Sequence, residues 1–163
     1  MVLSGPRTTG DGKQPKTKIH LTRSREERKE GQTPLKGIEA IATSVVDTAF
    51  HLHRDLGPGL LESVYEAVME KMLKERGLAV ERQKSVPISY AGLDFDEGFR
   101  ADLVVEKCLV VELKSVEKIA PVHAKQLLTY LRLMNLSLGL LINFGAPTFK
   151  AGIRRIVNNH IES

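Results

Sequence analysis

Three charged residues stand in an otherwise apolar stretch near the middle of the chain: Asp102, Glu112 and Lys114, within RADLVVEKCLVVELK. A charge on a strand that packs into a core is costly unless it is paired or holds a metal ion. Two carboxylates and a lysine that converge could hold Mg²⁺ or Mn²⁺ and position a water for phosphodiester hydrolysis. The alternative is a salt bridge on a solvated face of the sheet.

The register of the hairpin decides between these interpretations. Side chains alternate between the two faces of a strand, so Glu112 and Lys114 share a face. A plain two-residue loop within the turn at residues 106–108 would pair Asp102 with Val111 and place Asp102 on the other face. A three-residue loop, or a bulge there, pairs Asp102 with Glu112 instead. The site hypothesis therefore requires an odd loop or a bulge.

Apolar periodicity predicts the elements that must position these side chains. Some segments of the chain have apolar residues at helical spacing, and others have the alternating or continuous apolar runs that are typical of strands. The order αα-βββ-α-β predicts an α/β core of about 125 residues. The segment GIRRIVN (152–158) is ambiguous between a strand and a helical turn. The predicted elements are helices at 38–55, 61–76 and 121–135, and strands at 80–90, 95–105, 108–114 and 136–144.

Proline, glycine and asparagine mark the boundaries of these elements. The segment LGPGL (56–60) should separate the first two helices, because proline and glycine interrupt helical structure. Pro87 lies inside a predicted strand and indicates an edge strand or a bulge. Asn143 ends the continuous apolar strand and is expected to satisfy a loop.

Length and composition predict one globular domain rather than two. The chain has 163 residues, which is enough for a single hydrophobic core. The one cysteine, Cys108, excludes an internal disulfide and suits a reducing compartment. No signal peptide and no apolar run of membrane-spanning length is found. We expect a cytoplasmic protein with no membrane contact.

The basic character of the chain is concentrated at its N-terminus. Residues 1–36 hold nine Lys/Arg and four Asp/Glu, whereas the remainder holds 15 basic and 16 acidic residues. Residues 1–34 lack apolar periodicity, so we predict a disordered basic tail at 1–34 followed by a domain at 35–163. Such a tail can add non-specific affinity for phosphate, but charge alone does not identify a nucleic-acid-binding protein.

Four stretches in order resemble the GxxExxY protein family, a member of the PD-(D/E)XK nuclease-like superfamily: GPGLLESVYEAV, FRADLVVE, VVELKSVEKIAPVHAKQLLTYLRL and GLLINFG. The resemblance covers about residues 36–158. It implies a restriction-endonuclease-like core, in which helices flank a mixed sheet. It also implies a nuclease that depends on Mg²⁺ or Mn²⁺ and acts on nucleic acid, with DNA favoured over RNA.

The resemblance also implies roles for individual residues. Gly59, Glu62 and Tyr65 match the GxxExxY signature, and Gln126 and Tyr130 match a QxxxY element of one branch of the superfamily. Ala101 stands where the signature proline of the superfamily would precede the aspartate. The implied catalytic residues are Asp102, Glu112, Lys114, Gln126 and Tyr130, and the implied metal ligands are Glu62, Asp102, Glu112 and the backbone carbonyl of Leu113.

Arg100 and His123 are candidate substrate-binding residues. Arg100 could contact a backbone phosphate, or it could pair with Asp102 or Glu112. His123 could contact a phosphate, or it could make local hydrogen bonds in the first turn of its helix.

A different class of function is compatible with the same residues. A near-neutral domain, in a chain in which only 5% of the residues are aromatic, suits a non-catalytic nucleic-acid-binding or protein-assembly module that retains the nuclease fold. A homodimer or a partner protein could then supply the grip on nucleic acid. The sequence leaves the oligomeric state open, together with the choice between DNA and RNA and between endonuclease and exonuclease activity.

Overall fold

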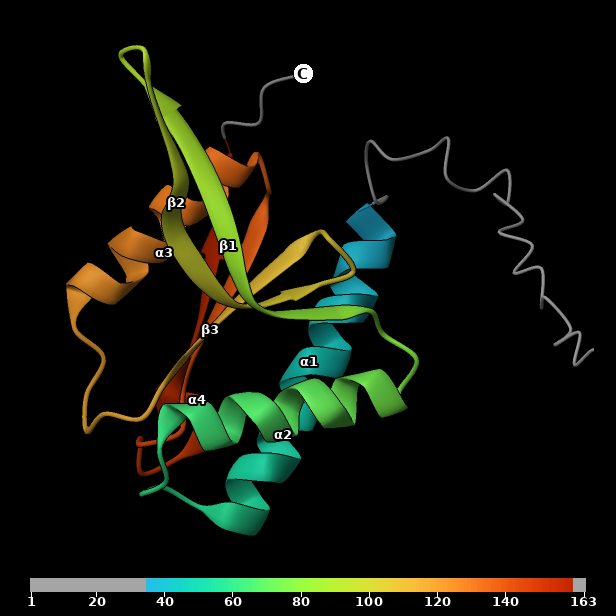
Figure 1. Ribbon diagram of the computed structural model, residues 1–163. Coiled ribbons are helices and arrows are strands. Elements are labelled where there is room, and N and C mark those ends of the chain that lie inside the picture. Colours follow the sequence, from blue (N-terminus) through green and yellow to red (C-terminus); the bar gives the residue numbers. More distant parts are fainter. Residues whose placement is uncertain (1–34, 160–163) are drawn as a thin grey trace, which may run out of the picture. The chain divides into compact units, whose positions relative to one another are not determined.

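The computed structural model describes residues 35–159, and the predicted N-terminal tail lies outside the described residues. Four helices and five strands form this part of the chain (Figure 1). The helices are α1 (Leu35–Leu56), α2 (Glu62–Glu75), α3 (Pro121–Met134) and α4 (Phe149–Gly152). The strands are β1 (Val80–Tyr90), β2 (Leu93–Val105), β3 (Leu109–Lys114), β4 (Leu138–Asn143) and β5 (Ile153–Val157).

The strands form one mixed sheet in the order β1-β2-β3-β4-β5. Strands β3 and β4 are parallel and are connected through α3, whereas the other neighbouring pairs are antiparallel. A parallel pair needs such a crossover, because a short turn cannot return the chain to the same end of the sheet. The predicted α/β fold, a mixed sheet flanked by helices as in restriction endonucleases, is confirmed.

Helices α1 and α2 cover one face of the sheet. Helix α1 presents a buried stripe at helical spacing, from Ile38 through Val45 to Leu52. Helix α2 adds Tyr65 and Met69 to the same core. These side chains pack against alternate residues of the strands, which therefore leave their other residues for the opposite face. The sheet partners in this core include Leu103, Leu109, Val111, Leu113, Leu140 and Ile142.

Helix α3 covers the opposite face of the sheet. Its buried residues Leu127 and Leu131 pack with Val104, Val110 and Leu141 in a second, smaller core. All six residues of β4 are buried, as the continuous apolar run predicted for a strand covered on both faces. Asp102 and Glu112 alternate with residues of the α1–α2 core, so they belong to the α3 side.

The C-terminal segment that the sequence left ambiguous contains both predicted structures. Helix α4 is one turn long and begins after Thr148, whose hydroxyl accepts a hydrogen bond from the Ala151 N–H. Strand β5 follows directly and adds to the sheet beside β4. The αα-βββ-α-β order is therefore extended by α4 and a fifth strand. Tertiary pairing with β4 decides this segment, because its few apolar residues specify neither period.

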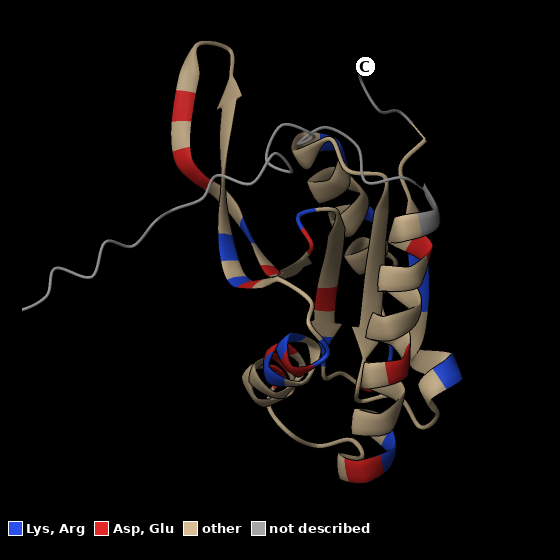
Figure 2. Cartoon of the chain, turned by 90° about the vertical axis from the view of Figure 1, so that its right-hand side faces the viewer, with Lys and Arg blue, Asp and Glu red and all other residues tan. Residues whose placement is uncertain are grey.

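Strand β1 is an edge strand with an irregularity at its proline, as predicted. Val86 pairs with Phe99 and Ile88 pairs with Phe95, so Pro87 lies opposite a bulge of β2. Beyond this bulge the hairpin of β1 and β2 projects as an arm (Figure 1), and Tyr90 near its tip is 81% exposed. Acidic residues line the β2 strand of this arm (Figure 2).

The loop between α1 and α2 is held in place by Tyr65. Gly59 has φ of +111°, a conformation that side chains with a Cβ rarely adopt. The Tyr65 hydroxyl donates to the Gly57 carbonyl at 2.5 Å and accepts from the Leu60 N–H at 3.2 Å. Its ring stacks on Phe144 with ring centroids 4.3 Å apart. The glycine and tyrosine of the signature thus determine where α2 begins.

None of the helices in residues 35–159 combines the length and the apolar character that crossing a bilayer requires.

Replacing Tyr65 with Phe should destabilise the fold by about 1–2 kcal/mol, because the half-buried Gly57 carbonyl and the Leu60 N–H lose their shared partner. Urea unfolding measures this change. Tyr90→Phe is the matched control, since Tyr90 is 81% exposed, and its free energy of unfolding should equal that of the wild type. Equal stability of Tyr65→Phe and the wild type would show that the loop does not depend on this hydroxyl.

Candidate metal-binding and catalytic site

The turn between β2 and β3 has the odd length that the site hypothesis requires. Leu103 pairs with Val111 and Val105 pairs with Leu109, which leaves a three-residue loop at 106–108. Glu106 and Lys107 adopt positive φ values of 50° and 55°. This register places Asp102 opposite Glu112, on the same face, and the prediction of an odd loop is confirmed.

Asp102 and Glu112 are held side by side by reciprocal backbone hydrogen bonds. The Asp102 N–H donates to Glu112 Oε1 at 3.3 Å, and the Leu113 N–H donates to Asp102 Oδ2 at 2.8 Å. Each carboxylate therefore accepts a hydrogen bond from the backbone of the opposite strand. The two strands are tied together here by their acids.

Burial and repulsion act together on Glu112. Its side chain is 8% exposed, and desolvation followed by the negative charge of Asp102 raises the pKa of Glu112 to about 8. Lys114 lies close enough to oppose this shift, which places its charge near the acid pair. Without a metal ion, this pair therefore holds a proton at neutral pH.

The chain directly after Lys114 is clamped by Asn143, which pairs with Lys114 across β3 and β4. The Asn143 side chain accepts from the N–H groups of Val116 and Gly145, both at 3.0 Å, and donates to the Val116 carbonyl at 2.8 Å. A Cβ on Gly145 would overlap the Val116 backbone, so only glycine fits there. The expectation that Asn143 satisfies a loop is confirmed.

Helix α3 brings Tyr130 and Gln126 to the acid pair. Burial, and then the charges of Glu112 and Asp102, raise the pKa of Tyr130, whereas a hydrogen bond with Gln126 lowers it. The Tyr130 ring stacks on Phe99 of β2 with centroids 4.0 Å apart and planes 5° apart. The two residues of the QxxxY element thus lie together next to the acids.

Glu62 lies at the end of β3, one step beyond the acid pair. It is the first residue of α2, and its Oε1 accepts from the Ser115 N–H at 3.2 Å. The Ser115 hydroxyl donates to the Leu60 carbonyl at 2.7 Å, which fixes the same junction from the other side. Glu62 is therefore a neighbour of the site, engaged with the backbone that follows Lys114.

The donor set suits a hard cation. Within residues 35–159, no three or more His, Cys, Asp and Glu side chains are grouped so that they could hold a metal ion. Asp102 and Glu112 alone supply two converging carboxylates. Mg²⁺ is commonly bound through one or two carboxylates while it keeps several waters, so this pair fits such an ion. A divalent cation would also offset the burial and the repulsion that together raise the pKa of Glu112.

Arg100 and His123 are both engaged in local contacts. Arg100 donates from Nε and Nη2 to the Glu97 carboxylate at 2.9 and 2.8 Å, so its pairing partner is neither of the two site acids. His123 Nδ1 accepts from the Ala120 N–H at 3.2 Å in the first turn of α3. The structure thus contains the local hydrogen bond that the sequence analysis gave as the alternative for His123. Contact of Arg100 or His123 with a phosphate stays a prediction.

Two polar residues at the site were missed by the sequence analysis. Gln83 of β1 donates to Asp102 Oδ1 at 3.4 Å and to Glu66 Oε2 at 2.8 Å. Glu66 is 4% exposed in α2. The sequence held one signal, an acid next to Tyr65 in a buried stripe. It held none for Gln83, because only the pairing of β1 with β2 brings Gln83 to Asp102.

Comparison with known proteins gives one match. A family described as the PD-(D/E)XK nuclease superfamily matches residues 39–156, which include every residue of the site described above. No significant match was found among curated proteins or among solved structures.

The pKa of Glu112 predicts how stability depends on pH in the metal-free protein. Because the folded value of about 8 lies above the ordinary value of 4.5, the stabilising contribution is complete below 4.5 and is lost as pH rises through 8. In EDTA, the free energy of unfolding should fall more steeply over this range for the wild type than for Glu112→Gln. The exposed Glu117→Gln is the control and should follow the wild type. Parallel pH profiles for wild type and Glu112→Gln would contradict the raised pKa.

Proposed function

Because the chain belongs to the PD-(D/E)XK nuclease superfamily, we propose that it is a metal-dependent nuclease that hydrolyses phosphodiester bonds in DNA or RNA. The observation that carries this proposal is the acid pair: Asp102 and Glu112 are held side by side next to Lys114. Within the superfamily, the Gly59, Glu62 and Tyr65 signature favours the GxxExxY family. The repulsion in the acid pair favours a site that a cation completes.

Asp102, Glu112 and the backbone carbonyl of Leu113 would hold Mg²⁺ or Mn²⁺. Glu62 is not grouped with these two carboxylates in the described residues, so it would act on the ion through one of the waters that the ion keeps. Such an ion supplies Lewis acidity toward a phosphoryl oxygen and lowers the pKa of a bound water. Oxygen donors favour these ions over zinc, which prefers cysteine and histidine ligands.

The remaining site residues have roles that follow from their contacts. Lys114 carries a charge next to the acids, and in the described part of the chain its ammonium group has no ion-pair or hydrogen-bond partner. It can therefore orient the attacking water or offset charge that develops on the phosphate. Gln126 and Tyr130 together present an amide and a hydroxyl beside the acids, which can orient the scissile phosphate or the lysine.

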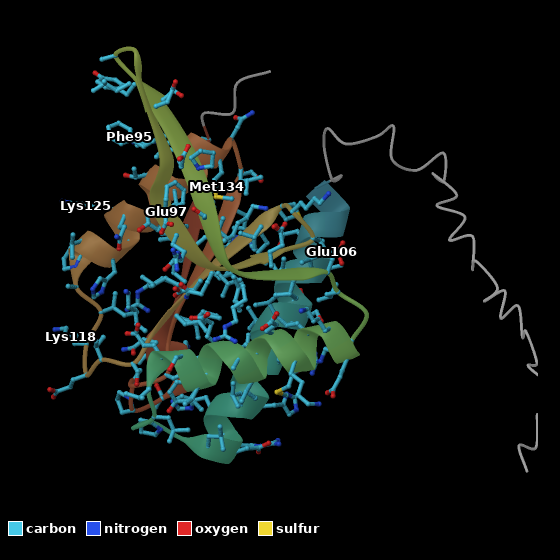
Figure 3. All side chains as sticks on the ribbon, in the orientation of Figure 1. Phe95, Glu97, Glu106, Lys118, Lys125 and Met134 are labelled. Carbon is cyan, nitrogen blue, oxygen red and sulfur yellow. The ribbon has the colours of Figure 1, made fainter. Side chains whose placement is uncertain are left out.

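The distribution of charge supports a polyanionic partner. Residues 118–159 hold six Lys/Arg and no Asp or Glu. Lys118, Lys125 and Arg132 are exposed, and within the described residues none of them has a carboxylate partner. Lys118 and Lys125 lie along the outer side of the molecule, from the loop before α3 to α3 itself (Figure 3).

Exposed cations in the first half of the domain are instead paired. Lys71 contacts Glu75, Lys74 contacts Glu70, and Arg54 contacts Asp55. Unpaired cations on and near α3, the helix that carries Gln126 and Tyr130, are therefore available for phosphate groups.

The alternative is a binding or assembly module that keeps the fold without catalysis. One observation favours it: the described residues group two acids, rather than three, within metal-binding range. This alternative predicts nucleic-acid binding without cleavage.

A cleavage assay with Mg²⁺ or Mn²⁺ on single-stranded DNA, duplex DNA and single-stranded RNA tests the proposal. We expect cleavage by the wild type, and a rate lower by about 100-fold or more for Asp102→Asn and for Lys114→Ala. Lys71→Ala is the control, because Lys71 lies in an exposed ion pair on α2. This variant should cleave at the wild-type rate. Cleavage that neither site variant reduces would refute the assignment. Binding without cleavage on every substrate would establish the alternative.

Nucleic-acid affinity should depend on the unpaired cations. In EDTA, the slope of log affinity against log salt concentration should be shallower by about 2–3 for the variant Lys118→Ala/Lys125→Ala/Arg132→Ala, since each lost duplex phosphate contact removes about 0.9. Fluorescence anisotropy with a labelled duplex measures the slope. The control variant Arg54→Ala/Lys71→Ala/Lys74→Ala removes equal charge from paired positions and should keep the wild-type slope. Equal slopes for the two triple variants would show that these three cations do not contact phosphate.

A further inference from the structure

Gln83 has an unusual backbone conformation at the middle of β1. The ladder between β1 and β2 passes from the Arg82–Leu103 pair directly to the Lys84–Ala101 pair. At Gln83 itself φ is +50°, in the left-handed region that few residues other than glycine adopt. Such a conformation is strained and persists only where surrounding structure imposes it. Gln83 is the residue of β1 that faces Asp102 in this register.

The side chain of Gln83 bridges two carboxylates. Its Nε2 donates to Glu66 Oε2 at 2.8 Å and to Asp102 Oδ1 at 3.4 Å. An ionised carboxylate only accepts hydrogen bonds, so the NH₂ group of the amide, and not its carbonyl, must face both acids. One NH₂ group has two hydrogens, which is enough for both contacts.

Glu66 gives this bridge a rigid support. It is 4% exposed, and a buried carboxylate is costly unless it is paired and hydrogen-bonded. Arg82 Nε donates to Glu66 Oε1 at 2.7 Å, and Gln83 satisfies the other oxygen. Arg82 also reaches Glu70 at 3.6 Å. Helix α2 thus anchors Gln83 through Glu66, whose ion pair with Arg82 is separate from Asp102 and Glu112.

Both oxygens of Asp102 are held through these contacts. Oδ2 accepts from the Leu113 N–H at 2.8 Å, and Oδ1 accepts from Gln83. Without Gln83 the carboxylate would keep one of the two hydrogen bonds and could rotate about the Cβ–Cγ bond, a torsion with broad energy wells. Rotation of this group would move the oxygens that are to meet a cation.

We propose that Gln83 is a positioning residue, whose amide orients the Asp102 carboxylate for the cation and ties it to the buried Glu66, which is itself paired with Arg82. This inference rests on the proposed metal site. Residues that hold a metal ligand in place commonly change metal affinity 10–100-fold when they are replaced. In this proposal, the strained conformation of β1 at Gln83 serves to place the amide within reach of both Glu66 and Asp102.

Mn²⁺ binding at pH 8, measured from the free-ion signal in electron paramagnetic resonance, tests the proposal with the full chain and no nucleic acid. Gln83→Ala should bind Mn²⁺ about 10-fold or more weakly than the wild type. Gln83→Gly should lose the same affinity but unfold at higher urea concentration than Gln83→Ala, because glycine tolerates the positive φ. Ser89→Ala is the control, since it removes a side-chain hydrogen bond elsewhere on β1 and should bind as the wild type.

The outcomes separate the proposal from a merely structural role. If Mn²⁺ affinity followed stability, so that Gln83→Gly recovered wild-type affinity, backbone strain and not the amide would be responsible, and the proposal would be wrong. Wild-type affinity in Gln83→Ala would also overturn it, provided that Asp102→Asn abolishes binding. If Asp102→Asn leaves Mn²⁺ binding intact, the metal site of the proposed function fails together with this inference. If Mn²⁺ binding depends on both residues but no substrate is cleaved, the positioning role stands and the nuclease assignment fails.

Discussion

The structure depends on one unfavourable interaction, the forced proximity of the Asp102 and Glu112 carboxylates. Burial of Glu112, and then the negative charge of Asp102 beside it, raise the pKa of Glu112 to about 8. The backbone nevertheless holds the pair together, because each acid accepts an N–H from the opposite strand. The metal-free pair therefore takes up a proton, and a bound cation would remove the need for one, as the proposed metal site requires.

The rest of the fold keeps this pair in one geometry. A three-residue loop sets the register of β2 and β3, and Asn143 of β4 clamps the chain that follows Lys114. Tyr65 holds the loop that starts α2, so that Glu62 meets the end of β3. These contacts come from both faces of the sheet. The acid pair on the α3 side of the sheet is therefore supported by packing on both faces.

Much of this arrangement could be predicted from the sequence, because local patterns carry it. Helical spacing in α1, the continuous apolar run of β4 and Pro87 each predicted what the structure contains. The D…ExK spacing identified Asp102 and Glu112 as candidates. Whether they share a face then depended on one feature, the length of the turn at residues 106–108. The sequence left the segment that forms β5 ambiguous between a strand and a helical turn, because five residues with two arginines have no clear period and form a strand only through pairing with β4.

The sequence by itself determined the order of elements and the identity of Asp102, Glu112 and Lys114 as candidates, because burial and strand alternation depend on residue type and spacing. Tertiary structure alone decided which side chains surround them. Gln83 reaches Asp102 across a strand pair, Glu66 approaches from α2, and Arg100 turns to Glu97 rather than to the acids. The contacts of Gln83 with Asp102 and Glu66 join residues that are distant in the chain and depend on the positive φ angle of Gln83, and neither property is encoded in local spacing.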